Sequence, residues 1–209
     1  MTPPGSLRDA ADDLRTLAWL HAAEQPPAAW LALHEAGFPA GLSVLSVQDA
    51  AMAQMCSALR LLRAACDADA QRAADDLAAD FAAIYLTHHI QASPYESVWL
   101  DEDHLLLQGP TFAVREAYRK HGLGAPDWRM LPDDHLTHQL SFVAALLDKG
   151  ALDEARDFMA QHLMRWLPRF AERVAQRAGT PIYAALATLT LQVCRGVEQA
   201  LPAAAPQPA

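Results

Sequence analysis

Apolar residues recur every three or four positions along most of the chain, which is the period of an amphipathic helix. In the segment from about 70 to 86, for example, Leu77, Phe81 and Ile84 fall on one helical face. No segment alternates apolar and polar residues in the manner of a half-buried strand. The pattern therefore predicts an all-α fold, a helical bundle of about ten helices.

Two segments interrupt the helical period. Residues 87–110 contain Pro94, Gly109 and Pro110 and read as a long irregular loop. A loop of more than about 15 residues is uncommon inside a compact helical domain and usually has a function. The second interruption is a connector at 122–132, which we expect to separate two helical parts.

Residues that start and stop helices support these boundaries. Asp133 is predicted to cap the helix that follows the connector, and Pro181 to occupy the first turn of the last helix. The Pro/Ala-rich end of the chain is expected to be disordered. The predicted organisation is one compact unit with an N-terminal part over 1–121 that includes the loop, the connector 122–132, a C-terminal part over 133–201 and a disordered tail over 202–209.

Composition and charge narrow the possible functions. The chain of 209 residues has 16 Lys and Arg against 25 Asp and Glu, a formal net charge of −9, which argues against unassisted binding to nucleic acid or an anionic membrane. A cationic partner remains compatible. The three cysteines are widely spaced and indicate a reducing compartment. The first residues lack the features of a secretory signal, and the longest apolar window, 182–194, is too short to span a bilayer. We therefore expect a cytoplasmic protein without stable membrane insertion.

The stretch "LPDDHLTHQL" at 131–140 allows two interpretations. Asp134, His135 and His138, with His88 from the loop, are candidate ligands for a metal-dependent helical hydrolase. Alternatively, Asp133 or Asp134 caps a helix and the histidines are surface or packing residues. The chain has no helical metal-binding motif and no nucleotide-binding glycine motif. No metal and no cofactor are therefore expected, and the hydrolase stays an alternative.

Aromatic and acidic residues gather in the irregular segments. Tyr95, Trp99 and Trp128 lie there, and "LDEDH" at 100–104 adds Asp101, Glu102 and Asp103. Such residues are often core aromatics and a solvated charged loop. Together they would also suit a peptide that is cationic at one end and apolar along its length, because arginine pairs strongly with carboxylates.

Three stretches in this order resemble the TorD/DmsD/NarJ family of molybdoenzyme maturation chaperones, closest to its DmsD-like branch. They are "SPYESVWLDEDHLLLQGPTFAVREAYRKHGL", "PDDHLTHQLSFVAALL" and "HLMRWLPRFAERVAQRAGTPIYAAL", and the resemblance covers roughly 70–201. It implies an all-helical cytoplasmic chaperone, not an enzyme. Such a protein would bind the twin-arginine leader and apo-form of the catalytic subunit of a molybdenum-cofactor oxidoreductase of the DMSO or TMAO reductase type, delay its export and assist cofactor insertion.

The resemblance also implies site residues. The family's P-x-D-H signature falls on Pro132, Asp134 and His135, although Leu131 and Gln139 stand where many relatives carry acids. Its loop signature falls on 94–99. With the groove residues proposed from the pattern, the predicted peptide-binding set is Leu86, His88, Pro94, Tyr95, Ser97, Trp99, Asp101, Pro132, Asp134 and His135. A monomer or a dimer formed by helix exchange is compatible with the long connectors, and a structural adaptor that binds a folded enzyme is a third possibility.

Overall fold

The computed structural model describes residues 7–87, 89 and 91–202. These residues are all-helical, without a strand among them, and form α1 to α9, slightly fewer than the predicted ten. Two π-helical turns continue α3 and α7. The elements are α1 (Leu7–Ala22), α2 (Pro27–Glu35), α3 (Ala50–Phe81), η1 (Ala82–Leu86), α4 (Glu96–Leu100), α5 (Gly109–Lys120), α6 (Leu136–Asp148), α7 (Leu152–Phe158), η2 (Met159–Leu163), α8 (Met164–Arg177) and α9 (Pro181–Ala200).

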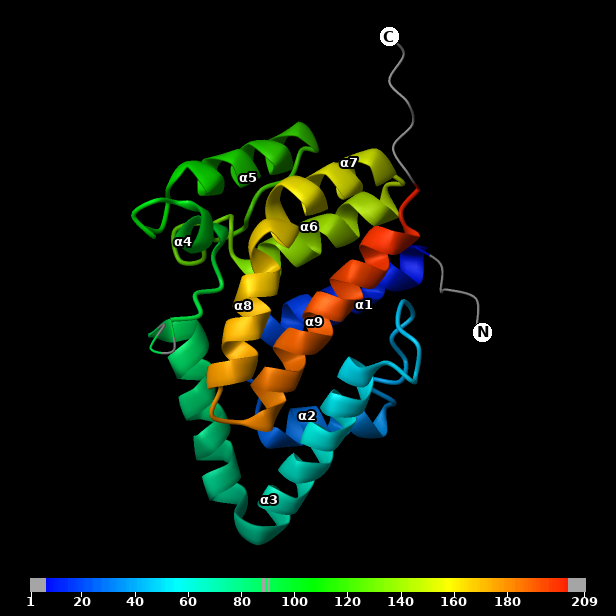
Figure 1. Ribbon diagram of the computed structural model, residues 1–209, viewed down its shortest axis with the longest axis vertical. Coiled ribbons are helices and arrows are strands. Elements are labelled where there is room, and N and C mark those ends of the chain that lie inside the picture. Colours follow the sequence, from blue (N-terminus) through cyan, green and yellow to red (C-terminus); the bar gives the residue numbers. More distant parts are fainter. Residues whose placement is uncertain (1–6, 88, 90, 203–209) are drawn as a thin grey trace.

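The core forms around α1 and α9, which lie side by side near the middle of the molecule (Figure 1). α1 packs against α6, and α9 packs against both α3 and α8. Leu186, Leu189 and Val193 of α9 are completely buried, in agreement with the apolar stripe of that segment. Since α1 and α6 come from the two predicted parts of the chain, helices of both parts share one core. The division into two parts stays a prediction.

The long element α3 is two helices joined at a bend, seen as the V at the bottom of Figure 1. Asp69 has extended backbone angles, and its carboxylate accepts a hydrogen bond from Arg72 N at 3.1 Å. Asp69 therefore caps the second arm in the way that Asp49 caps the first, through Ala51 N. The apolar stripe predicted for residues 70–86 runs along the second arm and η1.

Two sequence predictions need correction. The segment 87–110 is not irregular throughout, because it contains the short helix α4 and the start of α5. Asp133 does not cap the next helix. α6 begins at Leu136, and its N-cap is His135, whose Nδ1 accepts a hydrogen bond from Thr137 N at 3.2 Å. The tail residues 203–209 lie outside the described residues.

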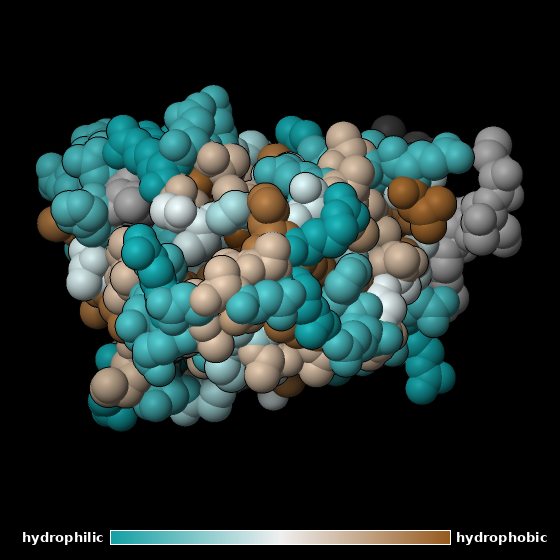
Figure 2. All heavy atoms as spheres, turned by 90° about the horizontal axis from the view of Figure 1, so that it is seen from below, coloured by the Kyte–Doolittle hydropathy of each residue, from teal (hydrophilic) through white to brown (hydrophobic). Residues whose placement is uncertain are grey.

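One face of the surface shows how hydrophilic and hydrophobic residues are distributed. On the face seen from below in Figure 2, hydrophilic residues are interleaved with hydrophobic ones, most of them only moderately hydrophobic. In the described part of the chain, every helix is too short or too polar to cross a membrane.

Candidate functional site

The short helix α4 is fixed to the start of α6 by hydrogen bonds between segments about 40 positions apart. Glu96 N donates to Asp134 O at 3.2 Å, and Leu136 N donates to Pro94 O at 2.9 Å. The buried Asp134 carboxylate accepts a further bond from Ser97 N at 2.8 Å through Oδ2. Asp134 is therefore hydrogen-bonded to the first turn of α4. The partial positive charge of this helix end also stabilises the negative carboxylate.

A buried polar network lies under α4. The Glu96 carboxylate accepts from Gln139 Nε2 at 2.6 Å, and its other oxygen lies 3.0 Å from Nδ1 of His162. Trp166 Nε1 donates to Gln139 Oε1 at 3.2 Å. Because Gln139 donates to Glu96, an acid at position 139 would place two carboxylates together. His162 belongs to η2, and π-helical turns are frequent at functional sites.

The connector is held against α5 by Asp133. Arg115 donates from Nε and Nη2 to Oδ2 of Asp133, at 3.0 and 2.8 Å. Tyr118 donates its hydroxyl proton to Asp133 O at 2.9 Å. The Arg115 guanidinium also lies 4.5 Å from the ring centre of Trp128. This pairing explains why Asp133 is not available as a helix cap.

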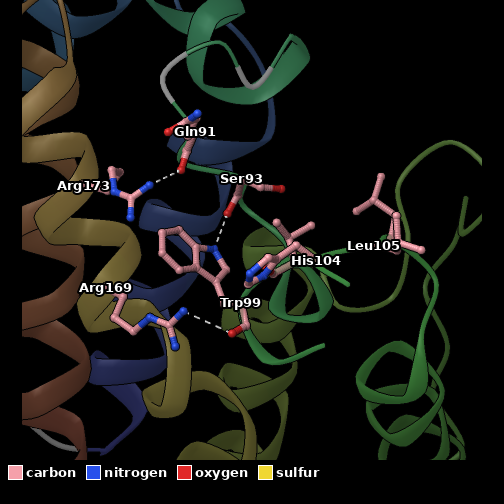
Figure 3. Close-up of a pocket in the computed structure, with 9 residues that line it drawn as sticks. Gln91, Ser93, Trp99, His104, Leu105, Arg169 and Arg173 are labelled. Carbon is pink, nitrogen blue, oxygen red and sulfur yellow. Dashed lines mark hydrogen bonds between the residues drawn. The ribbon is translucent and has the colours of Figure 1, made fainter. Parts of the chain in front are cut away.

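A cavity of about 730 Å³ opens beside α4, and we call it the Trp99 pocket (Figure 3). Trp99 forms part of its wall, and the indole Nε1 donates to Ser93 O at 2.7 Å. This bond fixes the ring against the chain that leads into α4. The other lining residues are Gln91, Ser93, Val98, His104, Leu105 and Leu106, with Arg169 and Arg173 from α8.

The α8 wall of the pocket is basic. The guanidinium carbons of Arg169 and Arg173 lie 5.1 and 5.4 Å from the Trp99 ring centre. Arg169 Nη2 donates to Trp99 O at 3.2 Å, and Arg173 Nη1 donates to Gln91 O at 3.0 Å, as Figure 3 shows. A pocket with two cations on one wall disfavours a third cation, because like charges repel.

The backbone around the pocket adopts rarely populated conformations. Gln91, His104 and Leu107 have φ values of 56°, 57° and 60°, although none of them is glycine. His104 Nδ1 lies 2.8 Å from Val98 O, and Asp101 Oδ2 accepts from Asp103 N at 3.1 Å. Such conformations cost on the order of 1–3 kcal/mol each and gather at functional sites. Their concentration here marks the pocket as a candidate site.

Comparison with known proteins decides the family. Residues 48–172, more than half of the chain, match the family model described as Nitrate reductase delta subunit. The chain belongs to this family.

Curated relatives of this nitrate reductase delta subunit family carry chaperone names. A chaperone protein TorD from Vibrio cholerae serotype O1 is 38% identical over 136 residues, which are 59% of this chain and 61% of the relative. A Tat proofreading chaperone DmsD from Salmonella typhi is 34% identical over 100 residues, 48% of this chain and 49% of the relative. A TorD from Psychrobacter sp. is 34% identical over 139 residues, 60% and 62% of the two chains. The matches thus span about half to three fifths of these relatives.

The structure places the predicted peptide-binding residues in different surroundings. Trp99 lines the pocket, and Asp101 lies partly exposed at the end of α4. Leu86 is 67% exposed at the end of η1 and is not among the lining residues. His88 lies outside the described residues. The others are buried around the α4–α6 junction and are Pro94, Tyr95, Ser97, Pro132, Asp134 and His135.

Tyr95 and His135 pack together within that junction, with ring centres 4.9 Å apart. Burial, and to a smaller extent the charge of Asp134, raises the pKa of Tyr95. Trp99 and Asp134 thus belong to one local assembly, but Asp134 is fully buried against the first turn of α4 and is not a lining residue. Its direct contact with a peptide arginine stays a prediction that would require α4 to move.

The alternative metal site is not formed by the residues that the structure describes. Among them, no group of three or more His, Cys, Asp or Glu side chains is placed to hold a metal ion. The Asp134 carboxylate and the His135 ring are bound to backbone N–H groups, and His138 Nε2 lies 3.2 Å from Leu131 O. Burial lowers the pKa of His138. The three side chains are thus engaged separately.

Sequence reasoning missed the basic wall of the pocket. Arg169 and Arg173 are four positions apart, so they share a helix face. This spacing is visible in the sequence, but nothing local shows that the face lies against Trp99, 70 positions earlier. Leu105 and Leu106, which follow the acidic run, were also missing from the predicted peptide-binding set, because this segment was interpreted by its charge.

Proposed function

We propose that this chain is a cytoplasmic maturation chaperone that binds the twin-arginine leader of a molybdenum-cofactor oxidoreductase of the DMSO or TMAO reductase type. It would delay export of the apo-enzyme and assist insertion of the cofactor. The single observation that carries the proposal is an aromatic pocket of about 730 Å³ beside an exposed acidic run, in a chain whose relatives include a Tat proofreading chaperone. The proposal requires no catalytic residue and no cofactor of the chaperone itself.

The two ends of a twin-arginine leader suit different parts of this region. Its apolar stretch fits the pocket, where Trp99, Leu105 and Leu106 supply apolar surface. Its arginines fit the exposed carboxylates of Glu102 and Asp103, which follow α4 and precede those leucines. The basic α8 wall disfavours binding of the leader arginines inside the pocket.

Titration calorimetry with an Arg-Arg leader peptide of a dimethyl sulfoxide reductase tests the proposal. Leu105→Ser replaces a side chain that is 53% exposed, so the fold should persist while the apolar contact is lost. We expect a loss of about 1–2 kcal/mol, and about 2 kcal/mol or more for Trp99→Ala, which removes a large aromatic anchor.

Trp19→Ala is the matched control, because Trp19 is 45% exposed on α1 and does not line the pocket. Its affinity should equal that of the parent chain. Binding that survives both pocket substitutions unchanged, or an absence of leader binding by the parent chain, would contradict the proposal.

The partner can be tested with the whole enzyme. The proposed chaperone should bind the apo-form of the catalytic subunit with its leader and lose most of this affinity when the leader is removed. An adaptor that recognises a folded surface would bind both forms equally. Co-purification of the two enzyme forms with the chaperone distinguishes these possibilities.

A further inference from the structure

Arg169 and Arg173 line the Trp99 pocket, and most of their N–H donors are not used by the bonds that hold them there. Each lies against the Trp99 ring, and each donates to one backbone carbonyl. A guanidinium carries five N–H donors, so four on each side chain are not used by these bonds. Within the described ranges, neither arginine forms an ion pair with a carboxylate. Two positive charges thus line the pocket without a counter-charge from that part of the chain.

Both arginines are held in place before any ligand arrives. The carbonyl groups of Gln91 and Trp99 fix one end of each guanidinium, and the indole ring supports its face. A planar guanidinium that is already oriented loses little conformational entropy when it binds a carboxylate with two parallel bonds. The α8 wall is therefore suited to a carboxylate ligand.

Part of the remaining lining is apolar, beside the polar residues Gln91, Ser93 and His104. Val98, Leu105 and Leu106 form this apolar part, and the last two are 53% and 40% exposed. The Ser93 hydroxyl, also at the pocket, is buried and has no hydrogen-bond partner among the described residues. A ligand that matches these walls carries an anionic group and an apolar group close together.

We propose that the Trp99 pocket recognises a segment of the client peptide in which a Glu or Asp side chain stands next to an apolar residue. The carboxylate binds Arg169 and Arg173, and the apolar side chain covers Leu105 and Leu106. This inference rests on the proposed function for one point, that the ligand is a peptide. It assigns the pocket to an acidic and apolar part of the client and leaves the leader arginines to the acidic run outside.

Two short peptides that differ in one charge test the inference. The probes are N-acetyl-Leu-Glu-Leu amide and N-acetyl-Leu-Gln-Leu amide, and binding is followed by the indole ¹H–¹⁵N resonance of Trp99, assigned with Trp99→Phe. A charge-assisted bond predicts that the Glu peptide binds about tenfold more tightly than the Gln peptide. The double variant R169Q/R173Q should bind both peptides equally.

Arg165→Gln is the matched control, because Arg165 is an exposed cation of the same helix that does not line the pocket. It should keep the tenfold preference. Equal binding of both peptides to the parent chain, loss of the preference in Arg165→Gln, or no shift of the Trp99 resonance would overturn the inference.

The Arg-Arg leader peptide, measured with the same proteins, separates this inference from the proposed function. If the leader binds but the Glu preference is absent, the carboxylate assignment fails and the chaperone proposal stands. If the Glu preference is present but no leader binds, the proposed function fails and the pocket remains a carboxylate site.

Discussion

The central helices and the α4–α6 junction are stabilised in different ways. In the centre, α1, α6, α8 and α9 bury aliphatic side chains against one another. At the junction, many of the buried residues are polar, among them Glu96, Asp134 and Gln139. The first region depends on apolar burial, which is not directional. The second depends on hydrogen bonds with defined partners, which fix α4 in one position.

This difference implies that stability and recognition depend on different regions of the molecule. The apolar centre supplies most of the free energy of folding, whereas the junction sets the position of the helix that carries Trp99 into the pocket. Buried polar groups cost free energy when they lose a partner. Substitutions at the junction should therefore alter the pocket before they unfold the molecule, and substitutions in the centre should do the reverse.

The largest effect is expected in the centre. Leu189→Ala removes a completely buried side chain of α9 and leaves a cavity, so the free energy of unfolding should fall by about 2–5 kcal/mol. Denaturation by urea measures this change. The folded fraction should bind the leader peptide with unchanged affinity. A parallel loss of leader affinity would show that the two regions are coupled.

The next effect depends on pH and also belongs to the centre. His21 is buried between the Tyr85 hydroxyl and the Thr190 hydroxyl, and burial lowers the pKa of His21 to about 3. Above the ordinary pKa of about 6.5, folded and unfolded chains are both neutral at this site. Below it the unfolded chain binds a proton first, so folding should lose about 1.4 kcal/mol per pH unit until the pH reaches about 3.

His21→Gln tests this pH dependence because glutamine does not titrate. Urea denaturation at several pH values between 7 and 4 should give a flatter dependence for the variant than for the parent chain. Curves of equal slope would remove His21 as the source of acid sensitivity.

A smaller effect is expected at the junction. Glu96→Ala deprives Gln139 and His162 of their acceptor, which should cost about 1–3 kcal/mol of stability. Leader affinity should also fall, because α4 is then less firmly positioned. Glu102→Ala, with an exposed side chain, is the stability control and should leave the denaturation midpoint unchanged. Loss of stability without loss of affinity would contradict the positioning role.

The smallest effect is expected at the rim of the pocket. Asp101→Asn removes the charge of a partly exposed residue while retaining an acceptor for Asp103 N. Leader affinity should fall by less than about 1 kcal/mol, and the loss should shrink at high salt because exposed charges are screened. Calorimetry at two salt concentrations measures both quantities. A loss that does not depend on salt would point to a structural role instead.

The centre was largely predictable from the sequence, and the junction was only partly so. The Pro181 start of α9 was predicted correctly, and the buried residues of this helix repeat with the helical period. Asp133 was wrongly predicted to cap a helix, because no local sequence pattern shows that Arg115 pairs with the Asp133 carboxylate. The binding of Asp134 to the peptide stays a prediction, whereas its bond to Ser97 was not foreseen because it joins positions 37 apart and leaves no local pattern. The basic wall was missed for the same reason.

Hydrogen–deuterium exchange with and without an Arg-Arg leader peptide locates the segments that the leader covers. We expect slower exchange in residues 91–106 and around Arg169 and Arg173 when the leader is present, with little change in α1 and α9. Protection confined to α1 and α9, or to the outer face of α3, with 91–106 unchanged, would contradict the assignment of the Trp99 pocket as the leader-binding site.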